Sequence, residues 1–220
     1  MSDLSGTAYR ARAHPQAISA TKLLGQVMFL VAIALAFAAV GTLVGRDLPI
    51  GTARLLSFGG FGMLMVSSFA GSRFRVGSFA MGWLFATALV IGLGLGPVIA
   101  YFATVDSGAL TQAFAGTAAT VAGAGALGYV LSKDLAPWMR PLSLVVFAAC
   151  LATIAITLFA GSVSPFISGG IYLLSAALIV VDFNFLRKHG TEADAIWLAT
   201  GIFVSIVNIF LSLLNIFSGR

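Results

Sequence analysis

The chain is dominated by seven long apolar stretches that are separated by short polar breaks. Each stretch is close to the roughly 20 residues that an α-helix needs to cross about 30 Å of hydrocarbon. Strands of a membrane β-barrel would alternate apolar and polar residues over about ten positions, and these stretches do not alternate. The sequence therefore predicts an all-α membrane protein with seven transmembrane helices, at residues 23–45, 55–71, 77–103, 108–131, 141–160, 164–186 and 195–217.

The composition agrees with a membrane protein. Hydrophobic residues make up 60% of the 220 residues and charged residues 9%, against roughly 25% charged residues in soluble domains. Few residues remain for a soluble domain. We therefore expect a flexible cytosolic tail over residues 1–22 and a seven-helix transmembrane domain over residues 23–217.

The distribution of Lys and Arg between the predicted loops sets the expected orientation, because basic residues near span ends resist translocation. Three lie on one side, Arg46, Arg54 and Arg220. The other side collects nine: Arg10, Arg12, Lys22, Arg73, Arg75, Lys133, Arg140, Arg187 and Lys188. The N-terminus is therefore predicted to be cytosolic and the C-terminus outside. This asymmetry accounts for the net charge of +5, so no nucleic-acid partner is indicated.

Asp182 is the one acidic residue inside a predicted span. An aspartate at mid-bilayer costs roughly 2.5–3.5 kcal/mol on insertion scales, so such an acid calls for a partner. Two interpretations stay open. In the first, Asp182 is enclosed, and its protonation controls a contact with an arginine. In the second, it leans toward the interface and forms an ion pair with a base at the cytosolic edge: Arg73, Arg75 or Lys133.

The last predicted span carries a polar stripe, which consists of Ser205, Asn208, Ser212 and Asn215. These residues are three or four positions apart and therefore share one helical face. Such a face is expected to look into the bundle or into a wet cavity, because lipid offers it no hydrogen bonds. Two roles stay open: the stripe holds the helix in the bundle, or it also lines a path for ions or protons.

The third predicted span contains Gly92, Gly94 and Gly96, followed by Pro97. Glycines let another helix approach closely, and proline removes a backbone donor, so we expect helix packing and a kink here. A phosphate-binding loop is not expected, because no strand precedes the glycines and no Lys-Ser or Lys-Thr pair follows them.

The sequence indicates neither an enzyme nor a metal centre. Cys150 is the single cysteine, which excludes intrachain disulfides and multi-cysteine metal sites. His14 and His189 lie outside the predicted spans, so neither supplies a catalytic base at membrane depth. We expect no catalysis and no cofactor.

Six segments, in order, resemble motifs of the Bax inhibitor-1 family of seven-span proteins. They are Gly92–Pro97, Gln112–Ala118, Gly128-Tyr129, Ser132–Leu135, Val181–Asn184 and Phe203–Phe210. The resemblance implies a central seventh helix wrapped by the other six. It also implies a pH-sensitive calcium leak that depends on two aspartates, one in span six and one in span seven. In the family, an arginine near the cytosolic end of span two is the alternative partner of the aspartate in span six.

Asp182 matches the first aspartate of the family, and Arg73 or Arg75 matches the arginine. Ser205 stands where the second aspartate is expected. The ion- and proton-sensing site is thereby reduced to Asp182 and Ser205. One charge and one hydroxyl replace two interacting carboxylates, so we expect weak calcium affinity at Asp182 and a flattened pH response. Calcium enters this hypothesis as a transported or weakly bound ion.

A serine at position 205 resembles instead the bacterial branch of the family, whose members associate with an FtsH-type membrane protease and dampen its activity. This resemblance implies a multi-pass protein of the bacterial inner membrane, and a monomer is expected. It also leaves a second function open, in which the tail from Met1 to Lys22 engages the protease and nothing is transported. A small transporter is less favoured, because no inverted repeat is visible.

Overall fold

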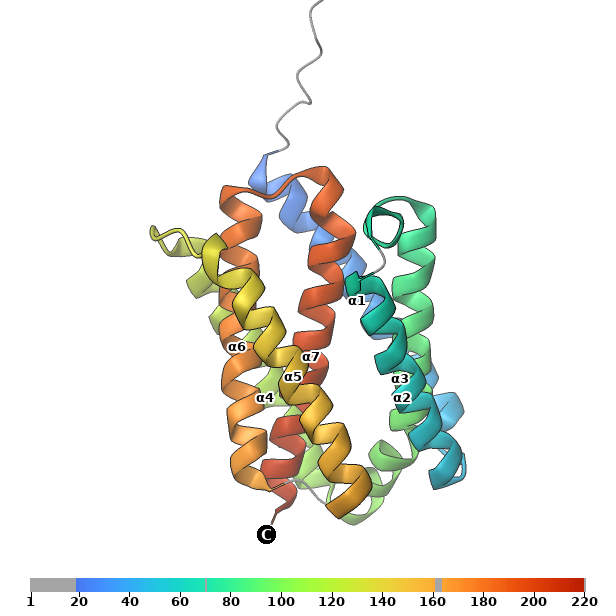
Figure 1. Cartoon of the computed structure of the whole chain (residues 1–220). Coiled ribbons are helices and arrows are strands. Elements are labelled where there is room, and N and C mark those ends of the chain that lie inside the picture. The colour runs from blue at the N-terminus through green and yellow to red at the C-terminus, as the bar shows by residue number, and fades with distance from the viewer. Residues whose placement is uncertain (1–18, 70, 161–163, 220) are drawn as a thin grey trace, which may run out of the picture.

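The computed structural model describes residues 19–69, 71–160 and 164–219, which form seven long α-helices and no strand (Figure 1). All seven helices are long and apolar enough to cross a membrane, so the predicted number and type of spans are confirmed. The helices are α1 (Ala20–Gly45), α2 (Ile50–Phe69), α3 (Ser78–Val105), α4 (Ser107–Val130), α5 (Ala136–Ala160), α6 (Pro165–Lys188) and α7 (Ala195–Ser218). The short 3-10 helices η1 (Ser72–Phe74) and η2 (Glu192–Asp194) precede α3 and α7.

Two helices, α2 and α5, begin five residues earlier than the sequence predicted, which is the largest shift among the helix starts. α2 begins at Ile50 and includes Arg54, where the span was predicted to start only at residue 55. α5 begins at Ala136 and continues through Pro141, where the span was predicted to start. A charged residue and a proline near a helix start were interpreted as breaks. Both are tolerated there, because side chains near the membrane surface reach water and a proline interrupts only one helical hydrogen bond.

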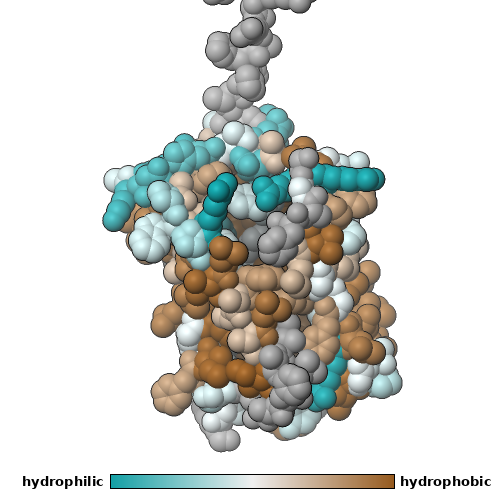
Figure 2. Space-filling model, viewed as in Figure 1, coloured by the Kyte–Doolittle hydropathy of each residue, from teal (hydrophilic) through white to brown (hydrophobic). Residues whose placement is uncertain are grey.

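The bundle has two distinct ends. We call the end that holds the start of α1 and the connection from α6 to α7 the inner end, and the end where α7 stops the outer end (Figure 1). Hydrophilic residues gather at the inner end and hydrophobic residues cover the middle of the visible face (Figure 2). This division is what a protein that crosses a membrane requires.

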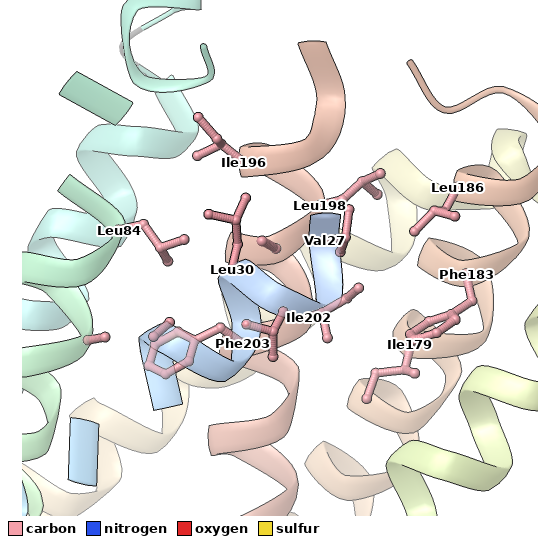
Figure 3. Packing of buried hydrophobic residues seen from close by; sticks show 14 of the residues in the cluster. Val27, Leu30, Leu84, Ile179, Phe183, Leu186, Ile196, Leu198, Ile202 and Phe203 are labelled. Carbon is pink, nitrogen blue, oxygen red and sulfur yellow. The ribbon is translucent and has the colours of Figure 1, made fainter. Parts of the chain in front are cut away.

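The helix α7 packs against α6, α4, α1 and α3. Its buried side chains form one cluster with those of α1 and α6, to which Val27, Leu186 and Ile202 belong (Figure 3). Phe203 of α7 is completely buried as well. By contrast, α2 packs mainly on α3, and α5 mainly on α6.

The glycines of α3 lie in helix contacts, as expected. A Cβ atom on Gly92 would fall onto the carbonyl oxygen of Ala38 in α1, and one on Gly96 would fall onto the backbone of Gly45. Gly94 meets the neighbouring helix α2 in the same way. Because no side chain fits at these contacts, α3 approaches α1 and α2 backbone to backbone.

Candidate functional site

Asp182 is enclosed within the bundle. Only 5% of its surface is exposed, and it is the one charged residue among the buried residues that the structure describes. Its Oδ2 atom lies against α7, where a Cβ on Gly201 would stand 3.5 Å away. Oδ2 has no hydrogen-bond partner within the described part of the chain. The geometry therefore agrees with the enclosed acid and not with the interfacial one.

The bases that the sequence offered as partners of Asp182 lie elsewhere. The Cζ atom of Arg73, in η1, lies 5.0 Å from the centroid of the Phe79 ring, and Arg75 is exposed. Among the described residues, no ion pair joins Arg73, Arg75 or Lys133 to Asp182. For Arg73 and Arg75 the reason is their position after α2, because α2 packs on α3 and not on α6.

The helices α6 and α7 run antiparallel and keep one register along their contact. Near the inner end, Asp182 faces Gly201. Near the outer end, the Nδ2 of Asn215 donates a hydrogen bond to the Oγ of Ser168 at 2.7 Å. Each helix advances by the same number of residues between these two contacts. Residues midway between them on α6 and α7 therefore lie at the same level.

Those midway residues are Ser175 and Asn208. Together with Asp182 and Ser205 they form what we call the polar seam between α6 and α7. Each of the four carries a buried atom without a hydrogen-bond partner among the described residues: Ser175 Oγ, Asp182 Oδ2, Ser205 Oγ and Asn208 Nδ2. Buried polar atoms are normally paired, so four unpaired atoms along one helix contact single out the seam as a functional candidate.

One residue of the seam, Asn208, lines a cavity of about 530 Å³, which we call the outer cavity. It is lined by residues of α2, α3, α5, α6 and α7, including three members of the polar stripe, Asn208, Ser212 and Asn215. The fourth member, Ser205, is completely buried one turn further in, next to the level of Asp182. The polar stripe therefore faces the interior of the bundle and leads from the outer cavity toward Asp182.

A comparison with known families identifies the chain. The family model described as inhibitor of apoptosis-promoting Bax1 matches residues 20–220, which is nearly the whole protein. The chain belongs to the Bax inhibitor-1 family. Among its relatives, an uncharacterized protein of Pseudomonas aeruginosa is 28% identical over 194 residues, which cover 86% of this chain and 85% of that protein.

One residue of this Bax inhibitor-1 protein that the sequence analysis missed is Asn184. It is completely buried, and its Oδ1 accepts a hydrogen bond from the Leu135 N–H at 2.9 Å. Its Nδ2 donates, at 3.1–3.2 Å, to three backbone carbonyls at the end of α4 and in the connection that follows: Gly128, Leu131 and Lys133. The spacing of the two residues could have indicated a separate contact for Asn184. A side chain two residues after Asp182 points to nearly the opposite side of the helix, so Asn184 does not share the surroundings of Asp182.

The end of α6 holds the same connection through three further side chains, and we call the whole set the inner clasp. Each reaches one residue of the connection: Arg187 donates to the Leu131 carbonyl at 2.7 Å, Lys188 to the Ser132 carbonyl, and His189 contacts the Asp134 carboxylate at 2.8 Å. Three of the Bax inhibitor-1 segments, at the end of α4, in the connection that follows it and at the end of α6, are thus fixed to one another. Within the clasp, Asn184 projects from the side of α6 nearly opposite to Asp182.

Proposed function

We propose that this protein is a pH-sensitive cation leak of the Bax inhibitor-1 type in a bacterial inner membrane. In this proposal α7 is the central helix and the inner end of the bundle faces the cytosol. One observation carries the proposal: Asp182 is buried, and its Oδ2 is unpaired where the polar stripe leads inward from the outer cavity. A buried acid in a membrane helix is expensive, and it is kept where a path needs a charge.

Asp182 supplies the only negative charge of the proposed path. A cation that moves from the outer cavity along the polar stripe passes Asn208 and reaches Ser205 before it meets the carboxylate. When Asp182 is ionised it attracts the cation, and when it is protonated this attraction is lost. Gly201 keeps the carboxylate accessible from α7, because it has no side chain to cover it.

Calcium is the proposed cation, and the site favours its passage over its retention. Calcium takes six to eight oxygen ligands, and tight sites supply several carboxylates. Within the described residues, no group of three His, Cys, Asp or Glu side chains stands together. Asp182 with the Ser205 hydroxyl gives one charge and few oxygens, so we expect weak binding at Asp182 and no resident ion.

The leak is tested with purified protein in liposomes that contain a calcium-sensitive dye. Wild type is expected to carry more calcium than protein-free liposomes and to change its flux between about pH 6 and 8. Asp182→Asn keeps the size of the side chain and is expected to abolish the pH response. Asp47→Asn, at an exposed acid in the connection from α1 to α2, is the matched control. Wild-type flux equal to that of empty liposomes, or an unchanged response in Asp182→Asn, would contradict the leak.

A second function is modulation of an FtsH-type membrane protease without transport. Close backbone contacts between helices favour this function. For example, a Cβ on Gly128 of α4 would fall onto the Val180 carbonyl of α6. Helices packed so tightly resist being pulled out of the membrane by a protease. The tail proposed to engage the protease falls mostly on residues 1–18, which lie outside the described residues. Deleting Ser2–Ile18 leaves the Ser19 cap of α1 in place. The deletion is expected to abolish co-purification with the protease, and retained association would contradict this function.

A further inference from the structure

The walls of the outer cavity suit an apolar ligand. Its volume of about 530 Å³ lies within the roughly 300–1,000 Å³ that is typical of ligand pockets. Most of its lining side chains are Leu, Ile, Val or Phe, and no charged residue is found among the described residues that line it. A carboxylate inside the cavity would therefore lose water without gaining a cationic partner, whereas a hydrocarbon chain has no charge to desolvate.

The cavity is long in the direction of the helix axes. On α7 its lining extends from Val204 to Ser218, which corresponds to about 21 Å at a rise of roughly 1.5 Å per residue. On α3 it extends from Ile91 to Phe102, or about 17 Å. One leaflet of hydrocarbon is about 15 Å thick, half of roughly 30 Å. The cavity thus has the length of a lipid chain and lies at the depth of the leaflet at the outer end.

In Figure 1 α5 crosses in front of α7 and α2 lies beside α3, and both α2 and α5 line the cavity. Each of these two helices packs mainly on a different partner, α3 or α6. The Phe61 ring of α2 stacks on the Phe147 ring of α5, with 5.5 Å between the ring centroids. Because all the helices that line the cavity are long and apolar enough to cross a membrane, the cavity lies at the depth of the lipid chains.

We propose that one ester-linked acyl chain of a phospholipid occupies the outer cavity. The methyl end of the chain lies near Val204, and the ester lies at the level of Asn215 and Ser218, where the cavity reaches the outer end of α7. A phospholipid is favoured over a free fatty acid, because the described lining offers no cation to a carboxylate. Binding of the chain does not depend on the leak, although a bound chain would fill the same space.

The proposal is tested by photolabelling the full-length protein in phosphatidylethanolamine vesicles. Two phospholipid probes are compared, one with a diazirine near the chain methyl and one with a diazirine near the ester. The first is expected to label Val204 and Val207, and the second Leu214 and Ser218. Val40, which is 52% exposed on α1, reports labelling by the surrounding lipid. The bound chain is supported if the cavity residues are labelled at least as strongly as Val40, with the methyl-end probe on Val204 and Val207 and the ester-end probe on Leu214 and Ser218.

A matched pair of variants tests whether the labelled chain lies inside the cavity. Val207→Phe places a larger side chain in the cavity and is expected to reduce labelling of Leu214 severalfold. Val40→Phe makes the same change on the lipid-facing surface and is expected to leave it unchanged. Circular dichroism checks the fold of both, and if Val207→Phe does not fold, the depth pattern of the wild type decides.

Two results would overturn the proposal. The first is labelling of Val40 without labelling of the cavity residues. The second is cavity labelling by a diazirine fatty acid and not by either phospholipid. All of these measurements are independent of calcium flux, so a failure of the leak and a failure of lipid binding are told apart.

Discussion

The Asp182 carboxylate rests against the backbone of Gly201, where a Cβ would stand 3.5 Å from Oδ2. This separation is an ordinary van der Waals distance, so an alanine at position 201 fits without moving either helix. The contact therefore allows one methyl group to be added beside the carboxylate while the fold is kept.

Gly201→Ala is expected to lower calcium flux without loss of stability. The methyl group covers the side of the carboxylate that faces α7, and alanine is the better helix former by about 1 kcal/mol. Thermal unfolding in detergent measures the stability and dye-loaded liposomes measure the flux. Gly123→Ala, where nothing lies within 4 Å of the new Cβ, is the control and is expected to leave the flux unchanged. Equal flux in Gly201→Ala and wild type would contradict the role of this contact.

Asn184→Leu is expected to destabilise the protein by about 2–3 kcal/mol. The substitution keeps the branching and the number of side-chain heavy atoms, but it leaves the Leu135 N–H and several carbonyls at the end of α4 without their partner, and each buried orphan costs about 1–3 kcal/mol. Denaturant unfolding in micelles measures the loss, and faster hydrogen exchange of the Leu135 amide locates it. Gln112→Leu, at an exposed position of α4, is the control. An unchanged Leu135 amide would show that the inner clasp does not hold this connection.

Asp134 makes the inner clasp sensitive to acid. The Ala136 N–H and the contact with His189 hold the pKa of Asp134 below its ordinary value, and Lys188 acts in the same direction. A carboxyl whose pKa is lower in the folded protein stabilises it above the unfolded pKa of about 3.9, and this contribution is lost as the pH falls through the folded pKa.

The difference in unfolding free energy between wild type and Asp134→Asn is therefore expected to be present at about pH 5 and to disappear toward about pH 2. Unfolding series at several pH values measure it. A difference that grows on acidification would have the wrong sign and would rule out the carboxylate as its source. Asp106→Asn, at the cap of α4 on the opposite end of the bundle, shows whether the effect belongs to the inner clasp.

The number of helices could be predicted from the sequence because it depends on local properties, namely the length and hydropathy of each stretch. Asp182 could be selected as a candidate for the same reason, since one acid stands out in an apolar run. The inward direction of the polar stripe followed from its helical spacing and from the absence of hydrogen bonds in lipid.

The partners in the site could not be predicted in this way. Whether Arg73 or Arg75 reaches Asp182 depends on where α2 packs, and that is decided by glycine contacts between α2 and α3 and not by the charges themselves. Asn184 was missed for a related reason. It binds backbone carbonyls, which every residue carries, so no complementary side chain in the sequence points to it.

Ser205→Asp is expected to restore a steep pH response to the leak. Ser205 is completely buried, its Oγ has no partner among the described residues, and it follows Gly201 by one helical turn. An acid at this position joins Asp182 in the same seam. Two carboxylates so close repel each other, so they bind protons in two linked steps and share one proton over part of the pH range.

The same change adds a second carboxylate for calcium, so flux is expected to become both more selective for calcium and more dependent on pH. Ser205→Asn enlarges the side chain equally without adding charge, and it separates the effect of charge from that of size. Ser212→Asp adds the same acid about 10 Å further along α7, where its interaction with Asp182 is weak, because two helical turns rise about 11 Å. If all three variants steepen the pH response alike, the response reports added polarity in the bundle, and the pairing of positions 182 and 205 has no special part in it.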